Sequence, residues 1–70
     1  MTSNEAREKV IAEGYTIIDG RLINKTFCYA VRKGIKLVYG CVCIDPKTGE
    51  FCGQPSARVL AKKWSKAPKA

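Results

Sequence analysis

The sequence predicts a single α+β domain: an N-terminal helix, a short hairpin, a three-stranded antiparallel meander, and a C-terminal helix packed on the sheet. Apolar residues recur at helical spacing near both ends of the chain, while β-branched and aromatic runs fill the middle. Turns that contain Gly or Pro separate those runs. A chain of 70 residues has the size of one small domain, so a single domain is predicted over residues 1–70. Residues 67–70 are expected to form a frayed tail.

The first predicted helix covers residues 2–13. Thr2 stands three residues before Glu5, the capping-box pattern in which each side chain bonds the other's free backbone N–H. Ala6 and Val10 form a narrow apolar stripe, which indicates that this helix lies against another element. Gly14 follows as the left-handed residue that typically stands just past a helix end.

The hairpin is predicted over residues 15–23, with Asp19-Gly20 as its two-residue turn. Asp-Gly between β-branched residues favours a tight turn, because both turn positions need a positive φ. The meander takes residues 27–33, 35–44 and 50–53. Its first turn is predicted at Lys33-Gly34 and its second at residues 45–49, where Asp, Pro and Gly each supply turn chemistry.

The C-terminal helix is predicted to begin at Pro55 and to stop before Pro68, since Pro is tolerated in the first turn of a helix but not in its interior. Apolar side chains recur along it at the i, i+3, i+4 and i+7 spacing of one buried face: Ala57, Leu60, Ala61 and Trp64. This face is expected to belong to the core. A different face carries basic residues at four-residue spacing: Arg58, Lys62 and Lys66.

Strand pairing predicts where the four Cys lie. Pairing of Asp45 with Glu50 puts Cys43 opposite Cys52. A two-residue turn at Lys33-Gly34 puts Cys28 opposite Tyr39. All four thiols then share one sheet face and are interpreted as small core residues. The alternative is a zinc site, which the spacing disfavours because paired Cys-x2-Cys knuckles are missing; its ligands would be Cys28, Cys41, Cys43 and Cys52.

The composition argues against an enzyme and against a cofactor. The chain contains no His, so the usual general base and the commonest neutral metal ligand are missing. No stretch stays apolar for the roughly 20 residues that a membrane-spanning helix needs. The N-terminus lacks the basic start and apolar core of an export signal. We therefore expect a cytoplasmic binding protein with reduced thiols and no membrane association.

Charge is segregated along the chain. Residues 1–20 carry a net charge of −2 and residues 21–70 carry +9, which together give the overall +7. Such segregation attracts polyanions, nucleic acid first among them, and cations that contact phosphates give affinity without reading sequence. The candidate nucleic-acid-binding residues are Arg32, Lys33, Lys36, Lys47, Arg58, Lys62, Lys63 and Lys66.

Residues 27–66 resemble a known family. Three strands followed by a helix, with Asp-Pro-Lys-Thr-Gly-Glu in the second turn and Ser-Ala-Arg opening the helix, look like the arm-type DNA-binding domain of phage and transposon tyrosine integrases. In that family the sheet enters the major groove and the helix packs behind it. The resemblance implies groove or backbone contacts by Arg32, Lys36 and Lys47, and a Trp64 that anchors the helix.

Two functional hypotheses stay open. The first is a small basic, non-enzymatic nucleic-acid-binding accessory protein of bacterial or phage type, which binds DNA or RNA mainly through phosphate contacts. The alternative is a protein-interaction module, such as a phage-encoded inhibitor of a host protein, whose basic face docks on an acidic surface. Because both sheet faces are apolar, a homodimer through the less covered face is a further alternative.

Overall fold

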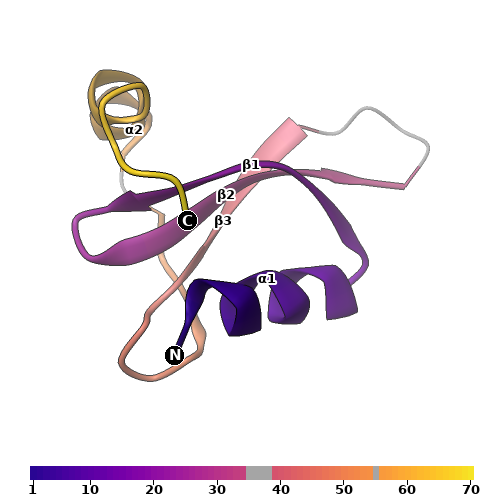
Figure 1. Cartoon of the computed structure of the whole chain (residues 1–70). Coiled ribbons are helices and arrows are strands. Elements are labelled where there is room, and N and C mark those ends of the chain that lie inside the picture. The colour runs from indigo at the N-terminus through magenta and orange to yellow at the C-terminus, as the bar shows by residue number, and fades with distance from the viewer. Residues whose placement is uncertain (35–38, 55) are drawn as a thin grey trace.

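The computed structural model of the chain describes residues 1–34, 39–54 and 56–70. These residues form a four-stranded antiparallel sheet in the order β1-β2-β3-β4, with α1 against one face and α2 against the other (Figure 1). The α+β class, with a helix at each end of the chain, is confirmed. In chain order the elements are α1 (Ser3–Ala12), β1 (Tyr15–Ile23), β2 (Thr26–Lys33), β3 (Tyr39–Ile44), β4 (Phe51–Cys52) and α2 (Ala57–Lys63).

Helix α1 begins with the predicted capping box. Oγ1 of Thr2 accepts the N–H of Glu5 at 3.2 Å, and Oε1 of Glu5 accepts the N–H of Thr2 at 3.0 Å. This second hydrogen bond holds the pKa of Glu5 below its ordinary value. Gly14 follows the helix with φ of 94°, the left-handed conformation that glycine adopts without steric cost.

The main core lies between α1 and the sheet. Ala6 and Val10 of α1 are fully buried against Tyr29, Val31 and Ile44, which point to the same sheet face. The phenol of Tyr29 donates a hydrogen bond of 3.3 Å to the Ser3 carbonyl, so this buried ring keeps a polar partner. Ala6 and Val10, four positions apart, are therefore the buried residues of α1, as their spacing predicts.

The predicted hairpin at Asp19-Gly20 is wrong, because β1 runs through both residues as one strand. Asp19 pairs with Ala30 and Gly20 with Tyr29 on β2. A Cβ on Gly20 would lie 2.7 Å from the Tyr29 ring, so this glycine serves close packing and not a turn.

The turn of this hairpin lies five residues further along, at Asn24-Lys25. Both residues have positive φ, 51° for Asn24 and 60° for Lys25, as a two-residue turn between twisted strands requires. Asn tolerates that conformation better than most residues, which the sequence reading overlooked.

A one-residue bulge at Ile18 places Ile17 and Ile23 of β1 on opposite faces of the sheet. The pairing of β1 with β2 shifts between Ile17 and Asp19, and Ile18 is 54 % exposed. Because of the extra residue, Ile17 packs with the α1 core while Ile23 belongs to the cluster beneath α2.

The first meander turn also differs from the prediction. Arg32 pairs with Tyr39, so a two-residue turn at Lys33-Gly34 is wrong. Gly34 has φ of 69°, but Lys33 belongs to β2 and lacks the positive φ that such a turn demands. Cys28 consequently faces Cys43 instead of Tyr39. Lys36, with the rest of residues 35–38, and Pro55 lie outside the described residues.

The second turn is confirmed. The N–H of Gly49 donates to the Asp45 carbonyl at 2.7 Å, and the N–H of Asp45 donates to the Glu50 carbonyl at 3.0 Å. Cys43 faces Cys52 as predicted. The corrected pairing differs from the predicted one by an even number of residues, so the Cys side chains keep the predicted sheet face.

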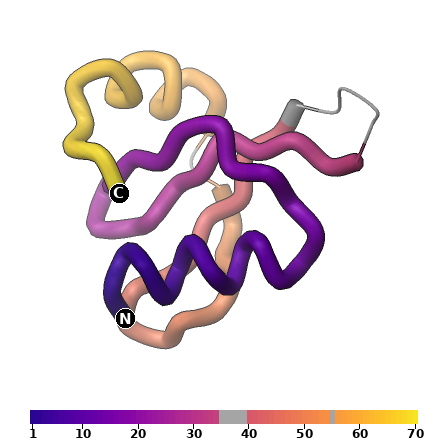
Figure 2. The backbone as a smooth tube through the Cα atoms, turned by 45° about the vertical axis from the view of Figure 1, so that its right-hand side comes forward, coloured from indigo at the N-terminus to yellow at the C-terminus, as the bar shows by residue number. Residues whose placement is uncertain are grey.

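The C-terminal segment lies along the outer edge of β1. After α2 the chain returns toward the sheet, and residues 68–70, expected as part of a frayed tail, run beside the strand (Figure 2). The Leu22 N–H donates to the Pro68 carbonyl at 2.9 Å, and the Ala70 N–H donates to the Gly20 carbonyl at 3.1 Å. These bonds pair backbone groups that an edge strand would otherwise leave open.

Candidate nucleic-acid interface

Helix α2 is held by its apolar face and therefore turns its basic face outward. Leu60 and Trp64 pack on the Cys side of the sheet, together with Ala67 that follows the helix. The Ser56 hydroxyl caps the helix by accepting the Val59 N–H at 3.3 Å. Three basic side chains of this helix are exposed, and Lys66 beyond its end joins them: Arg58, Lys62, Lys63 and Lys66.

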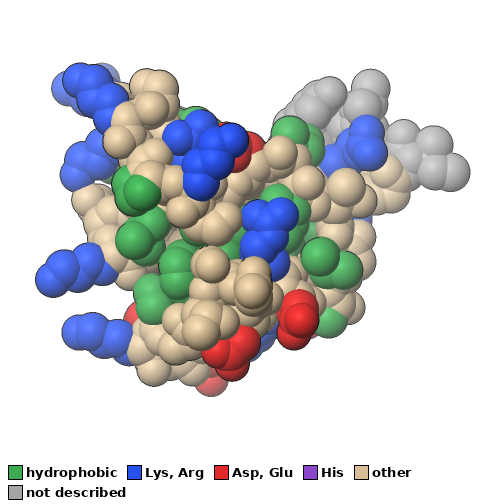
Figure 3. All heavy atoms as spheres, viewed as in Figure 1, with side chains coloured by type: hydrophobic (Ala, Val, Ile, Leu, Met, Phe, Trp, Pro, Cys, Tyr) green, Lys and Arg blue, Asp and Glu red, His purple; other side chains and the backbone are tan. Residues whose placement is uncertain are grey.

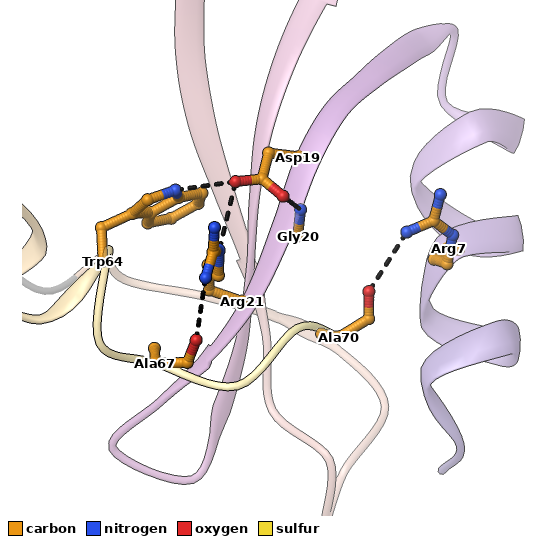
Figure 4. Close-up of polar contacts among 7 residues, drawn as sticks. All are labelled: Arg7, Asp19, Gly20, Arg21, Trp64, Ala67 and Ala70. Carbon is orange, nitrogen blue, oxygen red and sulfur yellow. Dashed lines mark hydrogen bonds and ion pairs between the residues drawn. The ribbon is translucent and has the colours of Figure 1, made fainter.

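The Asp19 carboxylate fixes α2 on the sheet (Figure 4). Its Oδ2 accepts the indole N–H of Trp64 at 2.9 Å and the Nε–H of Arg21 at 3.1 Å. Its Oδ1 accepts the Gly20 N–H at 2.9 Å. The Trp64 hydrogen bond is the largest of several contacts that hold the pKa of Asp19 below its ordinary value.

Arg21 spans the gap between β1 and the segment after α2. Besides pairing with Asp19, its Nη1 donates to the Ala67 carbonyl at 2.9 Å. The Arg21–Asp19 contact is the one ion pair within residues 1–34, 39–54 and 56–70, and it neutralises Arg21. The exposed cations of α2 have no carboxylate at contact distance in this part of the chain. Arg21 therefore acts in structure, and the α2 cations stay available for a partner.

Lys63 connects α2 with the turn between β1 and β2. Its Nζ donates to Oδ1 of Asn24 at 2.6 Å. The neighbouring Lys25 is exposed at the tip of the same turn. Lys25 was not among the predicted site residues, because the turn was predicted at Asp19-Gly20. The residue that indicates the true turn is Asn24, which stands between two runs of β-forming residues.

Lys47 extends this basic region to the turn between β3 and β4. Its N–H donates to Oδ1 of Asp45 at 2.9 Å, which shapes the turn and leaves the Lys47 ammonium exposed. Both turns lie at the same end of the sheet, since Phe27 pairs with Ile44. An open depression of about 410 Å³ lies between them, lined by Asn24, Lys25, Thr26, Asp45, Lys47 and Cys52.

Two other predicted residues lie at the opposite end of the sheet. Arg32 and Lys33 end β2, about 20 Å along the strand from Thr26. The Lys33 ammonium lies over the Tyr15 ring, 5.3 Å from its centroid. These two cations are thus separated from the α2 group, and the predicted residues do not form one continuous patch.

One edge of the molecule is strongly basic. We call this group of side chains, which surrounds α2 and the two turns, the basic edge: Lys25, Lys47, Arg58, Lys62, Lys63 and Lys66. In the space-filling view Lys and Arg side chains project along the left side from α2 downward, others lie across the middle of the face, and most of the visible Asp and Glu side chains lie toward the bottom (Figure 3). The sheet lies between the basic helix α2 and helix α1, where Glu5 and Glu8 are balanced by Arg7 and Lys9, so the carboxylates of α1 do not neutralise the cations of α2.

The chemistry of the basic edge suits phosphate groups better than bases. The indole N–H of Trp64 is already bonded to Asp19, and its ring packs on the sheet. Phe51 is 40 % exposed, but the Lys9 ammonium lies 5.5 Å from its ring centroid. None of these rings offers a free platform for base stacking, whereas ammonium groups bind phosphate without regard to sequence.

The four thiols share the α2 side of the sheet. Cys28 and Cys43 are buried, Cys41 is half-buried and Cys52 is exposed, and all four are free. Among the described residues no three Cys, Asp or Glu side chains are arranged to hold a metal ion.

Comparisons with protein-family models, with curated proteins and with solved structures each gave no match. Among the described residues, neither helix has the length and apolar character needed to cross a membrane.

Proposed function

We propose that this protein is a small cytoplasmic accessory protein, without enzymatic activity, that binds DNA or RNA through the phosphate backbone. The observation that carries the proposal is the basic edge, whose exposed cations have no carboxylate at contact distance among the described residues. Phosphate contacts by such groups displace condensed counterions and give affinity that depends steeply on salt.

The mode of binding follows from the two faces of the sheet. Helix α1 occupies one face and α2 the other, so a sheet that enters the major groove is a poor fit for this chain. Contacts from α2 and the two turns reach the backbone without exposing the sheet. We therefore expect little discrimination between sequences.

Fluorescence anisotropy with labelled random-sequence DNA and RNA, each titrated at several salt concentrations, tests the proposal. If all six cations of the basic edge contact phosphates of duplex DNA, log K should fall with log salt at a slope of about −5. Absence of binding at low salt would overturn the proposal.

Matched variants locate the binding surface. The triple variant Lys62→Gln, Lys63→Gln, Lys66→Gln should lower the magnitude of that slope by about 2 to 3. The control Arg32→Gln, Lys33→Gln removes cations at the opposite end and should leave the slope nearly unchanged. Equal losses in the two variants would place binding elsewhere than on the basic edge.

A second candidate is a protein-interaction module whose basic edge docks on an acidic protein, as a phage-encoded inhibitor of a host protein does. An open depression of about 230 Å³ next to α2 favours it, because its lining is apolar: Ala30, Cys41, Leu60, Ala61 and Trp64. An apolar depression beside cations suits a protein surface better than a polyanion.

The two candidates are distinguished by Ala61→Glu. This substitution puts a carboxylate at an exposed position in the apolar depression. A protein partner recovered in stoichiometric amount by the wild type and lost with Ala61→Glu would support the second candidate, provided that nucleic-acid binding is weak in both. Sedimentation velocity on the same samples distinguishes a homodimer from a monomer.

A further inference from the structure

Three thiols form a row across adjacent strands. Cys28 of β2 faces Cys43 of β3, and Cys43 faces Cys52 of β4. The Sγ atoms of Cys28 and Cys43 are 3.2 Å apart, and Cys43 is the hydrogen-bond donor. Since directly opposed residues project to the same sheet face, Cys28 and Cys52 flank Cys43 from its two sides.

Exposure decreases steeply along this row. Cys52 is exposed, whereas Cys43 and Cys28 are 1 % and 0 % exposed beneath Leu60 and Trp64. A reagent in solution therefore meets Cys52 first and reaches the other two sulfurs only through it.

The surroundings of Cys52 favour an anionic reagent. Cys52 lines the depression between the two turns, where the ammonium groups of Lys25 and Lys47 outnumber the single carboxylate, that of Asp45. A negatively charged small disulfide is concentrated near such a surface, while a positively charged one is repelled.

We propose that Cys52 is a modification site for an anionic low-molecular-weight disulfide of the glutathione type, and that its oxidation is passed along the row to give a Cys28–Cys43 disulfide. The inference does not depend on nucleic-acid binding. None of the three thiols belongs to the basic edge.

Each step is a thiol–disulfide exchange. The Cys52 thiolate attacks one sulfur of oxidised glutathione, forms a mixed disulfide and releases one glutathione thiolate. Cys28 gives up its own proton to solvent, and its thiolate takes the Cys43 proton as Cys43 attacks the Cys52 sulfur and releases the second glutathione thiolate. Cys28 then gives up that proton to solvent, attacks the Cys43 sulfur and releases the Cys52 thiolate.

Atoms, electrons and protons balance without any further reagent. Two electrons pass from the sulfurs of Cys28 and Cys43 to one glutathione disulfide, which becomes two glutathione thiols by taking up the two protons. Cys52 ends as it began. The hydrogen bond between the two buried sulfurs favours the thiolate on Cys28, because it lowers the pKa of Cys28 and raises that of Cys43; the Cys28 thiolate, 3.2 Å away, is therefore the base that takes the Cys43 proton when Cys43 attacks.

Mass spectrometry of the native protein after incubation with oxidised glutathione, followed by alkylation and peptide mapping, tests the proposal. In the wild type we expect a transient glutathione adduct on Cys52 and then a Cys28–Cys43 disulfide. Cys52→Ser, at an exposed position, should slow formation of that disulfide about tenfold or more. Cys41→Ser is the control and should react like the wild type.

Two further arms test the order of transfer and the role of charge. Cys28→Ser should stop at a Cys43–Cys52 disulfide; if this variant is unfolded by circular dichroism, the wild-type time course alone decides the order. Oxidised glutathione should react about tenfold faster than cationic cystamine at low salt, and Lys25→Gln with Lys47→Gln should remove that preference. Unchanged oxidation in Cys52→Ser, or a final disulfide that contains Cys41, would overturn the proposal.

Discussion

The indole N–H of Trp64 donates a 2.9 Å hydrogen bond to Oδ2 of Asp19, which joins the end of α2 to the middle of β1 across 45 residues of chain. The same carboxylate oxygen accepts the Arg21 guanidinium. One acidic residue thus orients the helix that carries half of the basic edge. Its presence in β1 explains why Asp-Gly there does not make a turn.

Trp64→Phe should destabilise the fold by about 1–2 kcal/mol, because it removes a hydrogen bond to a charged group while keeping most of the ring. Urea unfolding followed by circular dichroism measures this change. In the Asp19→Asn background the same substitution should cost less, by about 1 kcal/mol, since the partner charge is already absent. Additive effects in this double-mutant cycle would mean that the pair contributes nothing to stability.

Acid should weaken the attachment of α2. The folded-state pKa of Asp19 lies below its unfolded value, so its contribution to stability is complete above the unfolded pKa of about 4 and is lost as pH falls through the folded value. Urea unfolding between about pH 5 and pH 2.5 should therefore show a steeper loss of stability for the wild type than for Asp19→Asn. Parallel pH profiles would contradict the expectation. Glu5 shifts in the same direction in both proteins and cancels in the comparison.

Gly20→Ala should destabilise the protein by about 1–3 kcal/mol through overpacking. The new methyl group would lie 2.7 Å from the Tyr29 ring and 2.9 Å from the Ala70 carbonyl oxygen, and both neighbours are held by their own contacts. Gly53→Ala is the matched control, because a Cβ there meets nothing within 4 Å and the backbone φ is not positive. Its effect should stay within about 0.5 kcal/mol. Equal effects on the free energy of unfolding would show that Gly20 has no packing role.

Thr2→Ala should cost about 1 kcal/mol, because it leaves the Glu5 N–H without its cap and frees the Glu5 carboxylate from the hydroxyl. Asn4→Ala, at an exposed position in the same turn, keeps the capping box and should be nearly neutral. Both are measured by urea unfolding. The loss in Thr2→Ala should appear together with reduced helical ellipticity, since Ala6 and Val10 dock α1 on the core.

The features that sequence predicted well are those with local causes. The capping box at Thr2, the helix stop at Gly14 and the turn beginning at Asp45 each follow from bonds between residues a few positions apart. The helical spacing likewise predicted that Leu60 and Trp64 meet the sheet, whereas Ala57 and Ala61, predicted on the same buried face, are exposed. Each of these predictions depends on residues that lie only a few positions apart in the sequence.

The errors arose where distant residues decide. Gly20 is needed because Tyr29 packs against it, and Asp19 is needed because Trp64 and Arg21 bond to it; none of these contacts shows in the local dipeptide. The candidate site was affected in the same way. Arg32 and Lys47 look equivalent in sequence, yet strand direction carries them to opposite ends of the sheet.

The pairing of residues 68–70 with β1 also bears on how copies of the protein meet. An open strand edge is a template onto which an identical strand can add, and repeated addition leads to fibrillar aggregates. At Gly20 and Leu22 the edge of β1 is already paired with residues 68–70 of the same chain. Colloidal stability at high concentration should therefore depend on the last three residues as much as on net charge.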